Sequence, residues 1–262
     1  MSSVAADQAC LNCGAELRGE FCHGCGQKAT STHLGLHEVF HEVTHEFLHL
    51  DGKVFQTLKV LVTAPGRLTS DLVEGRRARY ITPLRLYLTT SVLFFVLTVT
   101  VPNPGQPNFR ITMKDDNGQA ITQLTPELEQ RANRIRRTTV ESIPRLAFVL
   151  MPAFALLTLA FYRRSQPHVA AHLYYALHAH AFWFLVLAVA VLFRPLGTIV
   201  RGTVDVLGAG WLVAYYYIAL RRVYAESWLK TIAKGTAIAV LYIATIGLSL
   251  LALFNFIIAV VR

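Results

Sequence analysis

The sequence predicts an all-α, multi-pass membrane protein with a small cysteine-rich head near its N-terminus. Three observations predict this class: 53% of the 262 residues are hydrophobic, many of them gather in five long apolar runs, and four cysteines cluster near the start. The runs cover residues 84–101, 143–162, 173–193, 204–220 and 236–261. Because about 20 apolar residues cross a bilayer as a helix, we expect about five transmembrane helices.

The head contains two Cys-x-x-Cys-Gly motifs, at residues 10–14 and 22–26. Each motif lets a tight turn direct two sulfurs toward one ion, and its glycine permits a positive φ that brings backbone N–H groups near the thiolates. Four thiolates suit tetrahedral Zn²⁺ and leave no open position, so we predict a structural zinc ribbon with the ligands Cys10, Cys13, Cys22 and Cys25. Two disulfides or a redox Cys-x-x-Cys site are the alternatives.

The distribution of basic residues predicts the orientation of the helices. The formal net charge is +9, and basic residues cluster beside the first, second and fourth runs, at Arg76, Arg77, Arg79, Arg163, Arg164, Arg221, Arg222, Lys230 and Lys234. Loops rich in Lys and Arg tend to stay in the cytoplasm, so we expect a cytoplasmic N-terminus, an external C-terminus and an external loop at about residues 102–142. This distribution favours a membrane protein over a nucleic-acid-binding protein.

A row of histidines separates the head from the first apolar run. His33, His37, His41, His45 and His49 recur every four residues, and Glu38, Glu42 and Glu46 complete three overlapping His-Glu-x-x-His motifs. On a helix such motifs hold zinc in metalloproteases. Imidazoles at this spacing, at His37, His41, His45 and His49, could also form a second metal site or a pH sensor. The opposite face of the helix is apolar, which favours a third interpretation: the polar face of an amphipathic helix.

A second amphipathic stretch follows and ends at Pro65 and Gly66. It is too short to cross a bilayer, so we expect an interfacial helix. The arginines at 76, 77 and 79 then predict an anionic-lipid anchor, with an effector or phosphate site as the alternative. The expected domains are thus the zinc-ribbon head (1–30), an amphipathic, interfacial helical linker (31–82) and the transmembrane domain (83–262).

Two ionisable residues, His178 and His180, lie inside the third run. Ionisable residues within a span often mark a transport path, so these histidines suggest a transporter or channel. Neutral histidines that hydrogen-bond between helices are the commoner explanation.

Three segments of the sequence resemble a family of bacterial membrane proteins of unknown function with a zinc-ribbon head. They read CLNCGAELRGEFCHGCGQK, TLKVLVTAPG and EGRRARYITPLRLYLTTSVLFF, and the resemblance covers residues 10 to about 95. It implies an inner-membrane location and a zinc ribbon at the four cysteines, but no activity. The histidine row is not part of the family's pattern.

From these patterns we expect a non-enzymatic binding, scaffold or regulatory module of the bacterial inner membrane. Its partners would be the lipid bilayer and a cytoplasmic protein that docks on the zinc ribbon. The transporter with His178 and His180 is the main alternative, and a metalloprotease on the helix at 37–49 is a remote one.

Overall fold

The structure is a computed structural model that describes residues 9–29, 52–102 and 126–261. Over these residues it contains the helices α2 (Gly52–Thr63), α3 (Arg67–Val73), α4 (Pro83–Thr100), α5 (Pro126–Tyr162), α6 (Val169–Leu192), α7 (Thr198–Tyr224) and α8 (Trp228–Val261), and the 3₁₀ turn η1 (Arg194–Leu196). Five helical segments are long and apolar enough to cross a membrane. They lie in α4, α5, α6, α7 and α8, which confirms the predicted all-α class and the five spans.

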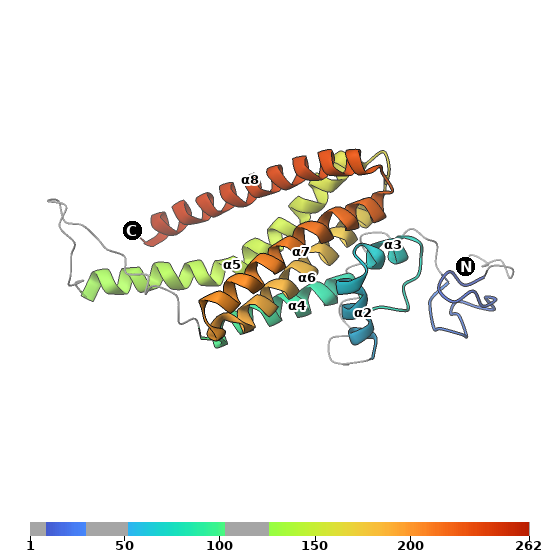
Figure 1. The fold of residues 1–262 in the computed structure, drawn as a ribbon, viewed down its shortest axis with the longest axis horizontal. Coiled ribbons are helices and arrows are strands. Elements are labelled where there is room, and N and C mark those ends of the chain that lie inside the picture. Colours follow the sequence, from blue (N-terminus) through green and yellow to red (C-terminus); the bar gives the residue numbers. More distant parts are fainter. Residues whose placement is uncertain (1–8, 30–51, 103–125, 262) are drawn as a thin grey trace.

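Two spans differ from the sequence prediction at their beginnings. The helix of the second span begins at Pro126, so α5 includes residues that we expected in an external loop, and its N-terminal part projects beyond the bundle (Figure 1). The segment at the start of α5 is polar, and hydropathy therefore did not assign it to the helix. The fourth span begins at Thr198. The residue before it, Gly197, has a φ of 95° and separates η1 from α7.

Helix α6 forms the centre of the bundle and packs against α4, α5 and α7. Half of its span is buried inside the protein, compared with 11% of the span in α8. Aromatic side chains fill the space between the helices: Phe182 of α6 stacks on Tyr215 of α7, and Phe154 of α5 contacts Tyr242 of α8. The large apolar surface that remains exposed on α8 is what a membrane-spanning helix requires.

Helices α2 and α3 are joined by a tight turn and pack together on one end of the bundle (Figure 1). Helix α2 is amphipathic, as predicted, because Val54, Leu58 and Leu61 pack in the core while Gln56 and Lys59 are exposed. The turn between the two helices has Gly66 at a φ of 76°, and a Cβ there would lie 2.9 Å from the carbonyl oxygen of Ala219. The turn between α2 and α3 therefore packs directly against the backbone of α7.

Candidate metal centre and its docking on the bundle

The four cysteines meet in one cluster within the head, which we define as residues 9–29. Their sulfur atoms all lie within 4.8 Å of one another. Cys10 and Cys25 are 3.6 Å apart between sulfurs, and Cys13 and Cys22 are 3.5 Å apart. A tetrahedral ion with metal–sulfur bonds of about 2.3 Å separates its ligands by about 3.8 Å, so the cluster has the size of a metal site. Both separations are far longer than a disulfide bond of about 2.05 Å.

The two knuckles fold in the same way because they share the same sequence pattern. In each knuckle the glycine amide donates to the carbonyl of the first cysteine at 2.8 Å, as seen for Gly14 and Gly26. These glycines have φ values of 78° and 73°, which confirms the positive φ expected from the sequence. Two isolated β-bridges, Ala9 to Glu16 and Phe21 to Lys28, close the knuckles.

Backbone N–H groups approach two of the sulfurs in equivalent positions. Burial alone would raise the pKa of Cys25, but hydrogen bonds from the amide of Gln27 and from the side chain of Asn12 lower this pKa to about 6. The amide of Ala15 approaches Cys13 in the same manner, although the neighbouring thiols raise the pKa of Cys13 to about 12. Such N–H donors stabilise thiolates, the form of cysteine that binds metals. The four cysteines can therefore bind a metal ion.

The head is attached to the rest of the protein through Gln27. The side-chain amide of Gln27 donates to the carbonyl of Gly75 at 2.7 Å, and its carbonyl oxygen accepts from the amides of Arg77 and Ala78 at 2.9 and 3.1 Å. One side chain thus makes three hydrogen bonds to residues 75–79, which we call the docking loop. Because Gln27 directly follows the second knuckle, its position depends on the fold of the cysteine cluster.

The first knuckle makes a second contact with the docking loop. A guanidinium nitrogen of Arg79 donates to the carbonyl of Asn12 at 3.0 Å. Leu11 packs against Gly75 so closely that a Cβ on this glycine would lie 2.6 Å from Cδ1 of Leu11. Gly75 has a φ of 86°, a conformation that disfavours any side chain. The loop and the head are therefore complementary in shape as well as in hydrogen bonding.

The docking loop begins with a Schellman motif at the end of α3. The amide of Gly75 donates to the carbonyl of Leu72 at 3.1 Å, and that of Arg76 donates to the carbonyl of Asp71 at 2.8 Å. This pair of bonds, with a left-handed glycine between helix and loop, is the usual way to satisfy the last carbonyls of a helix. It gives the loop a defined direction as it leaves α3.

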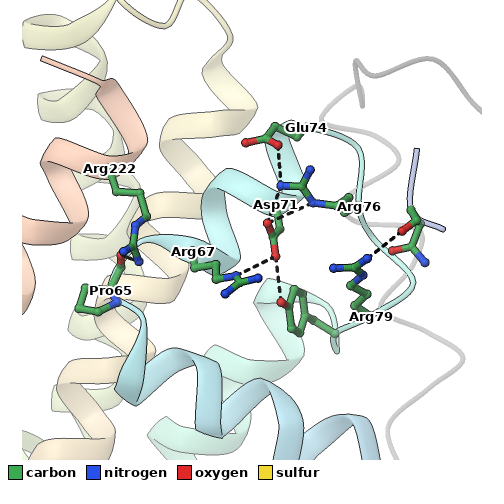
Figure 2. Close-up of polar contacts among 9 residues, drawn as sticks. Pro65, Arg67, Asp71, Glu74, Arg76, Arg79 and Arg222 are labelled. Atoms are coloured by element: carbon green, nitrogen blue, oxygen red, sulfur yellow. Dashed lines mark hydrogen bonds and ion pairs between the residues drawn. The ribbon is translucent and has the colours of Figure 1, made fainter. Parts of the chain in front are cut away.

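Asp71 connects the docking loop to α3 through a buried carboxylate that is 3% exposed. Its Oδ1 accepts from Arg76 at 2.6 Å, its Oδ2 accepts from the hydroxyl of Tyr80 at 2.9 Å, and Arg67 lies 3.7 Å from the same Oδ2. Figure 2 shows Arg67 and Arg76 directed toward this carboxylate from two sides, with Glu74 paired to Arg76. Three partners compensate for the removal of the carboxylate from water.

The environment of Asp71 shifts the pKa values of two partners. Hydrogen bonding to Asp71, which outweighs the effect of burial, raises the pKa of Arg76. Burial, together with the hydrogen bond to Asp71, raises the pKa of Tyr80. Arg76 and Tyr80 are therefore protonated at neutral pH and can both donate to the carboxylate of Asp71.

Helix α3 and the turn before it are hydrogen-bonded to helices of the bundle. On α3, Thr69 shares a buried hydrogen bond of 2.9 Å with Nδ1 of His178 on α6. On α7, Arg222 donates to the carbonyl of Pro65 at 2.6 Å. A continuous series of contacts therefore runs from the cysteine cluster through residues 75–79 and α3 to the central helix.

The two histidines that suggested a transporter form contacts between helices. His178 bonds to α3, as described above. His180 bonds through Nδ1 to the carbonyl of Ala176 at 2.8 Å and through Nε2 to the hydroxyl of Tyr242 on α8 at 2.7 Å. These bonds agree with the interpretation of neutral, hydrogen-bonded histidines, and nothing about them favours a transport path. Transport itself stays a prediction that the structure does not test.

The other predicted site residues have different outcomes. His37, His41, His45 and His49 lie outside the described residues, so the second metal site, the pH sensor and the metalloprotease stay predictions. Arg76 and Arg79 make intramolecular bonds in the docking region, as described above. Their role as a lipid anchor also stays a prediction.

Sequence reasoning missed the residues that attach the head. Gln27 and Asp71 were not singled out, because neither belongs to a known motif. One signal was present: Asp71 stands on a short helix beside a cluster of arginines, and an acid there suggests internal pairing. For Gln27 there was no comparable signal, because its partners lie 48 to 51 residues away along the chain.

These features define the class of the protein: a multi-pass helical membrane protein whose head carries four cysteines close enough together to hold a metal ion. Comparison with protein families adds one finding. Residues 51–95 match a family described as protein of unknown function (DUF3667). The match covers α2, α3, the docking loop and most of α4, and it excludes the four cysteines. No curated protein and no solved structure matches the chain significantly.

Proposed function

We propose that this chain is an integral protein of the bacterial inner membrane whose cytoplasmic head holds a structural Zn²⁺ and acts as a non-enzymatic docking, scaffold or regulatory module. The cysteine cluster carries the proposal. Four sulfur ligands around one point favour Zn²⁺ among the common metals and leave no position for a substrate. A head of about 20 residues has almost no core, so the ion would supply most of its folding free energy.

The exposed part of the head supports a role in binding. The first knuckle faces the docking loop through Leu11 and Asn12, whereas Phe21, beside the second knuckle, is 60% exposed. An exposed aromatic side chain on a rigid, metal-stabilised turn is a typical anchor for a protein partner. We infer that a cytoplasmic protein binds at Phe21 and the neighbouring exposed residue His23.

In-cell crosslinking and co-purification of the full chain test this proposal. A defined partner should be recovered with the wild type and with the control Arg18→Gln, which changes an exposed residue of the same head. Recovery should fall at least about tenfold with Phe21→Ser, which removes the anchor, and with Cys22→Ser, which unfolds the head. Membrane insertion should not change. Equal recovery with Cys22→Ser would contradict the proposal.

Metal analysis of the same preparations tests the identity of the ion. The wild type should contain about one zinc ion per chain, and Cys22→Ser should contain almost none, because three thiolates bind zinc far more weakly than four. A content of about two ions per chain would instead indicate the second site predicted at His37, His41, His45 and His49.

A further inference from the structure

A second candidate site lies at the end of the bundle that carries α3, where α7 connects to α8. The residues Ile218, Arg221, Arg222, Ala225, Glu226 and Trp228 line an open pocket of about 380 Å³ there. None of them belongs to the metal centre or to the docking loop. Pockets of this volume hold small ligands or the headgroup of a lipid.

The structure holds the two arginines of this pocket in defined positions. The guanidinium of Arg221 lies over the ring of Trp228, 4.5 Å from its centre. Arg222 donates through Nη1 to the carbonyl of Pro65. Figure 2 shows that this pair lies apart from Asp71 and its partners. A guanidinium has five N–H donors, and a single bond to a carbonyl leaves most of them for an anion.

The acid of the pocket does not cancel this positive charge. Glu226 accepts from the ammonium group of Lys234 at 2.6 Å and from the hydroxyl of Ser165 at 2.6 Å. Its charge is therefore balanced by Lys234, which does not line the pocket. Arg221 and Arg222 give the pocket a net positive charge, which favours an anionic ligand.

The depth of the pocket identifies the kind of anion. One candidate span ends at Tyr224 and the next begins at Trp228, so the pocket lies where two spans leave the hydrocarbon layer. Tryptophan and arginine are both typical of this headgroup level. One turn deeper on α7 the pocket is apolar at Ile218, and Leu229, which follows Trp228 in α8, is 81% exposed. A ligand with a phosphate and an acyl chain fits both surfaces.

We propose that this pocket binds the phosphate of an anionic phospholipid, through Arg221 and Arg222, with Trp228 positioning the guanidinium of Arg221. Paired guanidinium groups recognise phosphate oxygens with several charge-assisted hydrogen bonds. This pocket is separate from the lipid anchor that the sequence predicts at Arg76, Arg77 and Arg79. This proposal does not depend on the function proposed for the head.

The test measures binding of phosphatidylglycerol to the purified full chain in nanodiscs of phosphatidylcholine, by counting retained lipids with native mass spectrometry. The double variant R221Q/R222Q should weaken binding at least about tenfold. The matched control R163Q/R164Q removes two exposed charges at the same end of the bundle, outside the pocket lining, and should change binding less than about twofold. Equal losses in both double variants would show attraction to a charged surface rather than a site, and would overturn the proposal.

Two further measurements keep the outcome decisive. Arg221→Gln alone preserves the bond between Arg222 and Pro65, so it separates loss of the site from loss of fold; it should still weaken binding at least about threefold. Inorganic phosphate at millimolar concentration should not displace the lipid, because it lacks the acyl chain that contacts the apolar part of the pocket. Displacement at concentrations equal to that of the lipid would assign the site to a soluble phosphate and overturn the lipid proposal.

Discussion

The two ends of the helical bundle use their polar side chains in different ways. At the end that carries α3, polar bonds join elements far apart in the sequence: α3 to α6, α7 to the turn after α2, and the chain after α5 to the chain after α7. Toward the other end, several polar side chains bond within their own helix, as in the pair Arg137 and Glu141 and the bond from Asn255 to the carbonyl of Leu251.

This difference has a physical consequence. A bond within a helix satisfies a polar group in a bilayer without fixing one helix relative to another, whereas a bond between elements fixes both. At the end with the candidate metal centre, bonds between elements therefore fix the helices relative to one another. A head that docks there is positioned relative to α6, the most buried helix, and we infer that changes in the head reach the bundle through α3.

Among the substitutions that test this difference between the two ends, Asp71→Asn should lower the free energy of unfolding most. The change removes the charge at the centre of the network but preserves its size, and it leaves Arg76 without its main partner. We expect the free energy of unfolding to fall by about 2–3 kcal/mol, as measured by thermal unfolding in nanodiscs.

The matched control for this variant is Glu141→Gln on the projecting part of α5. It makes the same chemical change in an acid that is 52% exposed and paired only four residues along its own helix. We expect no measurable change in the free energy of unfolding, because an exposed ion pair of this kind contributes little to stability. Similar losses in the two variants would remove the distinction between the two ends.

A smaller effect is expected from Gly75→Ala in the docking loop. A left-handed φ costs a residue with a Cβ about 1–2 kcal/mol, and the new Cβ would also displace Leu11. Docking of the head should weaken by this amount, measured as faster limited proteolysis of residues 9–29 in the full chain. Gly19→Ala is the control, because a Cβ there has no atom within 4 Å. Equal proteolysis of the two variants would contradict the close approach of the head to the loop.

The smallest effect is a pH dependence at Glu226. Although burial raises the pKa of this group, the hydrogen bonds from Lys234 and Ser165 lower it to below the usual value of 4.5. The contribution to stability is therefore complete above about pH 4.5 and is lost as the pH falls through the lower, folded-state pKa. We expect less than about 1 kcal/mol in total.

The variant Glu226→Gln isolates this contribution. Thermal unfolding of the wild type and of this variant between pH 7 and pH 3 gives the stability of each protein as a function of pH. Any loss of metal from the head in acid affects both proteins equally, so it does not contribute to the difference between them. The difference in stability between the wild type and Glu226→Gln should become smaller only below about pH 4.5. A difference that narrows above pH 6 would contradict the assignment to this carboxyl group.

The sequence was informative where structure depends on local pattern. Apolar runs predicted all five spans, and the spacing of Cys10, Cys13, Cys22 and Cys25 predicted the cluster and the positive φ of its glycines. It was uninformative where structure depends on contacts between distant segments. Thr69 and His178 are 109 residues apart, and nothing near either residue indicates the other. The start of α5 was missed for another reason, because its first turns are polar and hydropathy detects only the part within the membrane.

Hydrogen exchange of the full chain in nanodiscs measures whether the folded cysteine cluster holds the docking loop through Gln27. The amides of Arg77 and Ala78 both donate to Gln27. We predict that chelation of the metal, or Gln27→Ala with the metal retained, increases exchange at these two amides at least about tenfold. The amide of Glu74, which donates to the carbonyl of Ser70 within the cap of α3, should keep its protection. Unchanged protection of Arg77 and Ala78 after complete removal of the metal would show that the docking loop does not depend on the folded cysteine cluster.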